Sequence, residues 1–167
     1  MSCDAAVGEL LAVLAASVRS DGRVLELGTG CGVGLAWIVH GLDGRADVDV
    51  VSIEQDAVVA ASTRRVGWPA EVSIVDGDAV ALLPTLGEFD LVFADSEGGK
   101  WERLDLTLAA VRVGGMLVVD DMTPARWESA QHETKTTGVR DRLVGDPTLR
   151  SVELAHGTGV ILSTRLL

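Results

Sequence analysis

The sequence predicts an α/β fold with a mostly parallel β-sheet that helices cover on both faces. Five short runs of apolar residues, many of them β-branched, alternate with longer segments of helical periodicity. Strands that are apolar almost throughout, each followed by a helix, are typical of a parallel sheet buried on both faces. Two final runs are separated only by AHGTG, which permits a hairpin and excludes a helical crossover. We therefore expect five β/α units closed by an antiparallel pair of strands.

The expected elements follow one another without a linker, an internal repeat or a low-complexity stretch, so we expect a single domain over residues 1–167. A first helix is expected over residues 4–19, where apolar residues recur at helical spacing before the turn-forming SDG. The expected parallel strands span residues 23–27, 48–53, 71–75, 89–94 and 115–120. The helices after them are expected at residues 33–42, 56–66, 79–86, 101–112 and 124–133.

The C-terminal part is expected to hold a loop with a short helix over residues 134–150, followed by hairpin strands at residues 151–154 and 159–164. In open parallel sheets, ligands bind at the carboxyl ends of the strands, where the strand order reverses. The residues directly after each expected strand are therefore the candidates for a functional site.

Charge and composition exclude several classes of function. The formal net charge is -11, and the only adjacent pair of basic residues is Arg64-Arg65. Nucleic-acid binders normally show a basic face, so nucleic acid and anionic membranes are not expected as partners. The N-terminus lacks the basic start of a signal peptide, and no apolar run reaches the length of a membrane span. We expect a cytoplasmic protein, and the abundance of Arg, Ala, Val and Gly suggests a bacterial source.

The glycine-rich stretch VLELGTGCGVG, residues 24–34, directly follows the first expected strand. A dinucleotide-binding fingerprint G-x-G-x-x-G is absent, because Val33 or Leu35 stands where its third glycine belongs. The pattern present is E-x-G-x-G-x-G, which starts at Glu26 inside the strand. Such glycines let the backbone approach a ligand closely, although a tight turn without a ligand also uses them.

This pattern resembles the first motif of class I S-adenosylmethionine (SAM) methyltransferases, which implies the strand order 3-2-1-4-5-7-6. The resemblance implies that the glycine turn lies under the methionine and ribose portions of SAM. It also implies that Glu54 accepts hydrogen bonds from the ribose and that Asp78-Ala79 contact the adenine, although Asp78 is equally suited to cap a helix. The implied cofactor-binding residues are Glu26, Gly28, Thr29, Gly30, Gly32, Gly34, Glu54, Gln55, Asp78, Ala79 and Asp95.

Three carboxylates follow the fourth and fifth expected strands, in the stretches LVFADSEGGKW and LVVDDM. If these strands are neighbours, Asp95, Asp120 and Asp121 converge at one edge of the sheet. Carboxylates packed that closely repel one another unless a cation lies between them, and Mg²⁺ prefers oxygen ligands. Asp121 or Thr123 is also suited to cap a helix that begins at Pro124.

The constellation resembles the metal-dependent O-methyltransferases of the catechol and caffeoyl-coenzyme A type. The resemblance implies that Asp95, Asp120 and Asp121 bind Mg²⁺ or another divalent cation. It further implies that the metal holds two oxygens of a small-molecule acceptor, lowers the pKa of the attacking hydroxyl and aims it at the methyl group of SAM. Trp101 and Trp127 are candidates for the walls of an aromatic acceptor pocket.

The sequence departs from that family at three places. Asp121 stands where the family has Asn, and Gly98 stands where the family has its catalytic lysine. Lys100 follows in a Gly-Gly loop that can bring it back to Asp95, so we take both residues as catalytic candidates. About 22 residues precede the first expected strand, fewer than in the family, so the acceptor is left without that cover or is covered by residues 134–150 or by the second subunit of a homodimer.

Three alternatives remain open from the sequence alone. The same fold can methylate without a metal, with Asp95 orienting the acceptor, or it can bind SAM or its demethylated product without catalysis. An NAD-dependent oxidoreductase fits less well, because the fingerprint fails and the chain contains no Tyr. His40, His132 and His156 show no ligand spacing, and we interpret them as structural.

Overall fold

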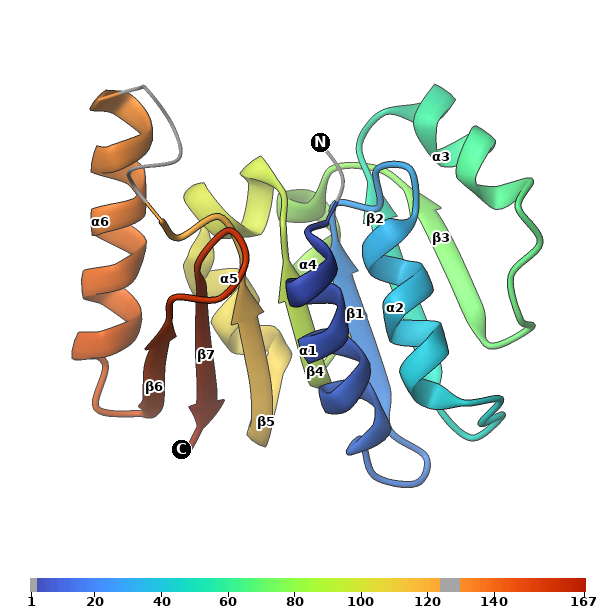
Figure 1. Cartoon of the computed structure of the whole chain (residues 1–167), viewed down its shortest axis with the longest axis horizontal. Helices are drawn as coiled ribbons and strands as arrows, with labels where there is room; N and C mark the ends of the chain where they lie inside the picture. The colour runs from blue at the N-terminus through green and yellow to red at the C-terminus, as the bar shows by residue number, and fades with distance from the viewer. Residues whose placement is uncertain (1–2, 124–129) are drawn as a thin grey trace.

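The structure, a computed structural model, describes residues 3–123 and 130–167 and contains one seven-stranded sheet of order β3-β2-β1-β4-β5-β7-β6 (Figure 1). The first five strands run parallel, and β7 pairs antiparallel with both β5 and β6. The strands are β1 (Arg23–Leu27), β2 (Asp49–Glu54), β3 (Val72–Asp76), β4 (Phe89–Ala94), β5 (Val111–Val119), β6 (Leu149–Leu154) and β7 (Val160–Arg165). The predicted fold class and strand order are confirmed.

Helices cover both faces of this sheet, with α1 and α2 on the near face of Figure 1 and α4 and α5 behind it. The helices are α1 (Ala5–Ala16), α2 (Val33–Leu42), α3 (Ala57–Arg64), α4 (Ala79–Leu86), α5 (Leu104–Ala110) and α6 (Ala130–Gly145), together with a π-helical turn η1 (Glu97–Trp101). Side chains at the starts of three helices act as caps, since Asp4, Asp56 and Asp78 each accept a hydrogen bond from a backbone N–H of the first turn.

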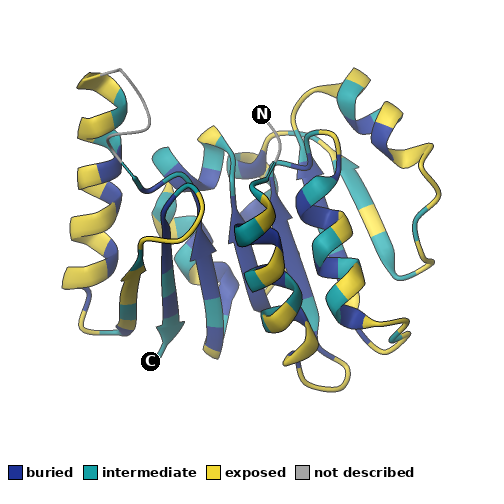
Figure 2. Ribbon diagram, in the orientation of Figure 1, coloured by how far each residue is buried: buried dark blue, intermediate teal, exposed yellow. Residues whose placement is uncertain are grey.

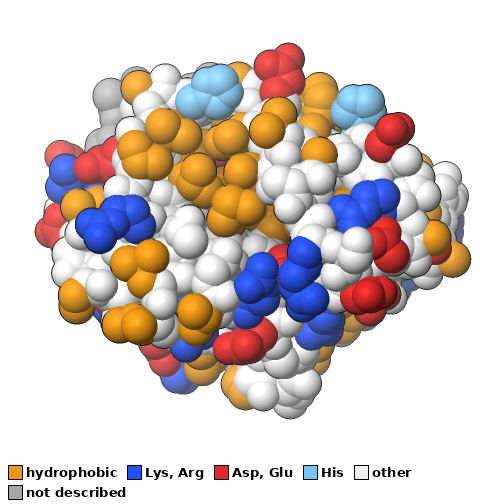
Figure 3. All heavy atoms as spheres, turned by 90° about the horizontal axis from the view of Figure 1, so that it is seen from below, with side chains coloured by type: hydrophobic (Ala, Val, Ile, Leu, Met, Phe, Trp, Pro, Cys, Tyr) orange, Lys and Arg blue, Asp and Glu red, His pale blue; other side chains and the backbone are white. Residues whose placement is uncertain are grey.

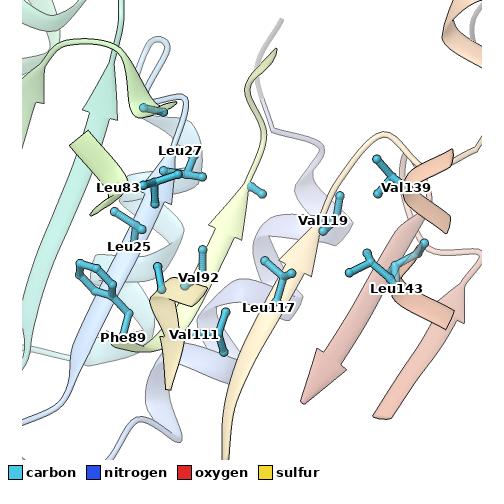
Figure 4. Packing of buried hydrophobic residues seen from close by; sticks show 14 of the residues in the cluster. Leu25, Leu27, Leu83, Phe89, Val92, Val111, Leu117, Val119, Val139 and Leu143 are labelled. Carbon is cyan, nitrogen blue, oxygen red and sulfur yellow. The ribbon is translucent and has the colours of Figure 1, made fainter. Parts of the chain in front are cut away.

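The strand residues alternate between two hydrophobic clusters, one on each face of the sheet. Leu25 and Val92 pack with residues of α4, α5 and α6, whereas Val24 and Leu91 pack with α1 and α2. Figure 4 shows the first of these clusters, and Figure 2 shows that the central strands are buried along most of their length. Because β4 is buried at all six positions, its carboxyl end is held rigidly in the middle of the sheet.

Ion pairs lie at the end of the sheet where the parallel strands begin, opposite their carboxyl ends. Asp90 is almost fully buried and accepts hydrogen bonds from Arg19 Nε and the backbone N–H of Arg23, both at 2.8 Å, and from Arg112. On this underside, basic and acidic side chains lie beside a patch of hydrophobic ones (Figure 3). A buried carboxylate with several hydrogen-bond donors stays ionised at little cost. We therefore interpret the ion pairs around Asp90 as structural.

The structure corrects two sequence-based boundaries. Residues 134–150 hold most of a long helix, α6, in place of the expected loop with a short helix, because Thr136, Val139 and Leu143 form a buried stripe at helical spacing. The helix expected over 101–112 ends earlier, and β5 begins at Val111, since this β-branched residue pairs with Phe89 at the start of β4. The first six residues of the helix expected over 124–133 lie outside the described residues.

The packing of α1 against α2 leaves no room for a side chain at Gly41. A Cβ atom there would lie 2.1 Å from the carbonyl oxygen of Ala12. We predict that Gly41→Ala lowers the free energy of unfolding by about 1–3 kcal/mol, because the two helices must move apart. Chemical denaturation measures this change. The control is Gly138→Ala, at a helical glycine with nothing within 4 Å. That change should raise stability by up to about 1 kcal/mol, and equal effects of the two substitutions would contradict the packing argument.

Candidate active site

A cleft of about 290 Å³ lies at the carboxyl ends of β1, β2, β3 and β4. Ten of the eleven residues expected to bind the cofactor line it: Glu26, Gly28, Thr29, Gly30, Gly34, Glu54, Gln55, Asp78, Ala79 and Asp95. Gly32 does not line the cleft but occupies the N-cap position of α2 with a φ of 85°. Its contribution is the left-handed backbone conformation that starts the helix.

The glycine loop is fixed by backbone contacts to both neighbouring strands. The N–H groups of Gly28 and Thr29 donate to the carbonyl of Ile53 at the end of β2. On the other side, a Cβ atom on Gly28, whose φ is 96°, would lie 2.6 Å from the carbonyl oxygen of Asp95. Only glycine fits at this contact, which joins the loop to the residue that follows β4.

Glu54 ends β2 with its carboxylate turned to the loop. Its Oε2 accepts a hydrogen bond of 2.8 Å from the N–H of Gly30, and its Oε1 accepts one of 2.9 Å from the N–H of Asp56. Each oxygen has a second acceptor position for a ligand hydroxyl. Asp78 accepts from the N–H of Val80 at 2.9 Å and thus caps α4 as well as lining the cleft.

Glu26 is a buried carboxyl beneath the loop. The Ser52 hydroxyl donates to it at 2.5 Å, and the Thr29 hydroxyl lies 2.5 Å from that of Ser52. Burial raises the pKa of Glu26 to about 8, and the hydrogen bond from Ser52 only partly opposes this rise. A Cβ atom on Gly34 would lie 2.4 Å from Glu26 Oε1, which explains why Gly34, the fourth glycine of the stretch 24–34, carries no side chain.

The three predicted metal ligands converge at the ends of β4 and β5. Asp95, Asp120 and Asp121 each place a carboxylate oxygen within 4.8 Å of the others. Asp120 Oδ1 accepts a hydrogen bond of 2.7 Å from the N–H of Asp121 and another from the Thr158 hydroxyl. Asp121 has a φ of 61°, a left-handed conformation in which Asp is commoner than most residues. Burial raises the pKa of both Asp95, to about 7, and Asp120.

Lys100 reaches this acidic cluster from η1. Its side chain is almost fully buried, and Nζ lies 3.3 Å from Asp95 Oδ1, 3.4 Å from Asp121 Oδ2 and 3.5 Å from the carbonyl oxygen of Asp120. The ammonium also lies 4.7 Å from the centroid of the Trp101 ring, within the range of a cation–π interaction. The expected return of Lys100 to Asp95 is therefore present in the structure, while its role as a base stays a prediction.

The two glycines before Lys100 make this return possible. Gly99 has a φ of 87°, and a Cβ atom there would lie 2.6 Å from Leu27 Cδ1. The carbonyl of Gly99 accepts a hydrogen bond of 2.7 Å from the Thr107 hydroxyl in α5. The turn that carries Lys100 is thus anchored against both the sheet and a helix.

Sequence reasoning missed three residues around the site. Thr158, in the β6–β7 loop, donates to Asp120, and Cys3 lines the cleft with a thiol whose pKa burial raises to about 12. His132, interpreted as structural, places Nε2 3.3 Å from the carbonyl oxygen of Asp121 and packs edge-on against Trp101. No local pattern signals these contacts, because each joins segments far apart in the chain. Trp127 lies outside the described residues.

The family of this chain follows from comparison with known proteins. The model of a methyltransferase domain matches residues 25–122, which include the glycine loop and all three clustered aspartates. The chain belongs to this methyltransferase family. A catechol O-methyltransferase of Mycobacterium tuberculosis is 31% identical over 120 residues, which make up 69% of this chain and 54% of that protein. The chain thus spans about half the length of that relative.

Two further relatives match almost the entire chain. A provisionally named O-methyltransferase of Mycobacterium ulcerans is 29% identical over 173 residues, or 96% of this chain and 76% of that protein. The crystal structure of TomG, an O-methyltransferase of Streptomyces achromogenes in complex with SAM, superposes with a TM-score of 0.77 at 26% identity, covering 99% of this chain and 82% of TomG. The predicted kinship with class I SAM-dependent O-methyltransferases of the catechol type is confirmed. Within the described ranges, no helix has the length and hydropathy needed to span a membrane.

The buried Glu26 makes the stability of the chain depend on pH. Because its folded-state pKa of about 8 lies above the ordinary value of 4.5, the folded state retains a proton that the unfolded state releases between these values. Stability should therefore fall with rising pH across this window, by at most about 1.4 kcal/mol per pH unit from this group. We predict that Glu26→Gln, which cannot release a proton, gains stability relative to the wild type between pH 5 and pH 8.

Denaturant titrations at several pH values measure this difference. The control is Glu9→Gln, at an exposed position of α1, for which we expect the pH profile of the wild type. Parallel profiles of Glu26→Gln and the wild type would show that the Glu26 carboxyl does not retain its proton on folding.

Proposed function

We propose that the chain transfers the methyl group of SAM to a hydroxyl group of a small-molecule acceptor. The observation that carries this proposal is the position of Asp95. This residue lines the cleft with the expected cofactor-binding residues, and its carboxylate belongs to the cluster around Lys100. A methyl donor in the cleft and an acceptor at the cluster would therefore lie side by side, as methyl transfer requires.

The cleft supplies suitable partners along the whole of SAM. Glu54 has free acceptor positions for two ribose hydroxyls, and Asp78 can accept a hydrogen bond from the adenine amino group. Asp95 brings the negative charge of its ionised carboxylate to the end of the cleft next to the cluster, where it lies beside Asp120 and Asp121. That charge favours a sulfonium cation and the ammonium of its methionine portion. Bound SAM supplies an electrophilic methyl group, and the chain's own residues must orient the acceptor and manage its proton.

Lys100 and Asp95 are the residues that can act on the acceptor hydroxyl. As the oxygen bonds to the methyl carbon and the carbon–sulfur bond breaks, the hydroxyl proton must move to a base. Asp95, with a pKa raised to about 7, can take up this proton near neutral pH. Lys100 stabilises the developing negative charge as an ammonium, or accepts the proton if it is neutral.

The donor set at the cluster also fits a divalent cation. Asp95, Asp120 and Asp121 would hold it, since all three offer carboxylate oxygens and Mg²⁺ prefers oxygen ligands. A bound ion would lower the pKa of an acceptor hydroxyl.

The named relatives are bacterial, and we extend the proposal to a bacterial enzyme of the cytoplasm. A homodimer stays a prediction from the sequence.

Cofactor binding is the first test of this function. We predict that S-adenosylhomocysteine (SAH), the demethylated product, binds the wild type in a calorimetric titration and binds Glu54→Ala at least ~10-fold more weakly. The loss reflects hydrogen bonds to a charged group, each worth about 1.5–3 kcal/mol, and the release of Gly30. Glu9→Ala serves as the matched control and should bind as the wild type does. A wild type that does not bind SAH would contradict the proposed function.

Transfer of a labelled methyl group from SAM to vicinal diphenols then tests catalysis. Asp95→Asn should reduce kcat by about 100-fold or more, in line with the loss of a positioned acid–base group. SAH affinity measured on the same variant separates lost chemistry from lost cofactor binding. A wild type that binds SAH and methylates no acceptor would favour the non-catalytic alternative.

A further inference from the structure

The Lys100 ammonium contacts the same carboxylates that would hold a divalent cation. Nζ lies 3.3 Å from Asp95 Oδ1 and 3.4 Å from Asp121 Oδ2, so it bridges the residues that follow β4 and β5. The side chain of Lys100 is only 3% exposed. A cation of the chain itself is therefore held at the acidic cluster, shielded from water.

We propose that Lys100 is the resident cation of the acidic cluster and competes with divalent metal ions for Asp95 and Asp121. The inference deepens the proposed function, because it concerns the same site and rests on the assignment of that site. It predicts that the wild type binds a divalent ion weakly and that methyl transfer draws on the lysine for the positive charge that a metal would otherwise supply.

The competition follows from distance and charge. A divalent ion lies about 2.1 Å from each ligand oxygen when it is Mg²⁺, whereas the ammonium already lies within 3.5 Å of two of these oxygens. On the same side of the two carboxylates, the ion and the ammonium would overlap. On opposite sides, they would repel each other across a buried space in which charges are poorly screened. Metal binding therefore requires Lys100 to withdraw.

Withdrawal is opposed by the way Lys100 is anchored. The ammonium also faces the carbonyl oxygen of Asp120 at 3.5 Å and the Trp101 ring at 4.7 Å. The preceding Gly99 is fixed by its close approach to Leu27 and by the hydrogen bond from Thr107. Asp120 Oδ1, the third carboxylate, already accepts from the Asp121 N–H and the Thr158 hydroxyl. The cluster is thus arranged around its own lysine.

Calorimetric titration of Mn²⁺ into the SAH complex tests the competition. The variants are Lys100→Met, which keeps the apolar stem and removes the charge, and Lys135→Met. Lys135 is the only other lysine of the chain and pairs with Glu97 in η1. We expect Lys100→Met to bind Mn²⁺ at least ~10-fold more tightly than the wild type, and Lys135→Met to match the wild type.

Equal Mn²⁺ affinities of the wild type and Lys100→Met would overturn the proposal, as would tighter binding by the wild type or binding to neither protein. If Lys100→Met does not fold, a crystal of the wild type soaked in Mn²⁺ decides the question. An anomalous peak between Asp95 and Asp121 with Lys100 displaced would support competition, whereas a peak with Lys100 still in contact, or no peak at a saturating Mn²⁺ concentration, would overturn it. Loss of SAH binding by the wild type would instead refute the methyltransferase assignment itself.

Discussion

The site depends on a contact that has no room for a side chain, between Gly28 after β1 and the backbone of Asp95 after β4. β1 lies between β2 and β4, so its loop meets Glu54 on one side and Asp95 on the other. The buried strands beneath hold this contact in place. A larger residue at Gly28 would separate the cofactor cleft from the acidic cluster. The proposed methyl transfer needs the two adjacent, because the donor binds in the cleft and the acceptor at the cluster.

A second constraint is the number of carboxyl groups that the fold collects at this end of the sheet. Glu26 and Asp120 are buried and Asp95 is partly buried, and burial raises the pKa of each. Hydroxyl groups of Ser52 and Thr158 donate to two of these carboxyls, and the Lys100 ammonium neutralises part of the charge on the third. A cationic ligand such as SAM would favour the ionised forms of Asp95 and Asp120, which is consistent with the methyltransferase family of the chain.

Much of this arrangement could be predicted from the sequence, because the relevant patterns are local. Alternating apolar strands and helices predict the parallel sheet, and parallel strands bring Glu54, Asp95 and Asp120 to one edge. The helix α6 could not be predicted, since its buried stripe of Thr136, Val139 and Leu143 is spread among polar residues. The π-helical turn that contains Lys100 has no periodic signal, and the approach of Thr158 depends on how the C-terminal hairpin lies beside β5. Contacts between distant segments are decided by packing rather than by local pattern.

The most direct test of the account is a crystal structure of the chain in complex with SAH. We expect SAH in the cleft over β1, β2 and β4, with its ribose hydroxyls within hydrogen-bond distance of Glu54 and its sulfur directed toward Asp95 and Lys100. This placement would put the methyl group of SAM next to the residues that can handle the acceptor proton. SAH bound elsewhere, or bound with its sulfur turned away from Asp95, would contradict the link between the cleft and the acidic cluster.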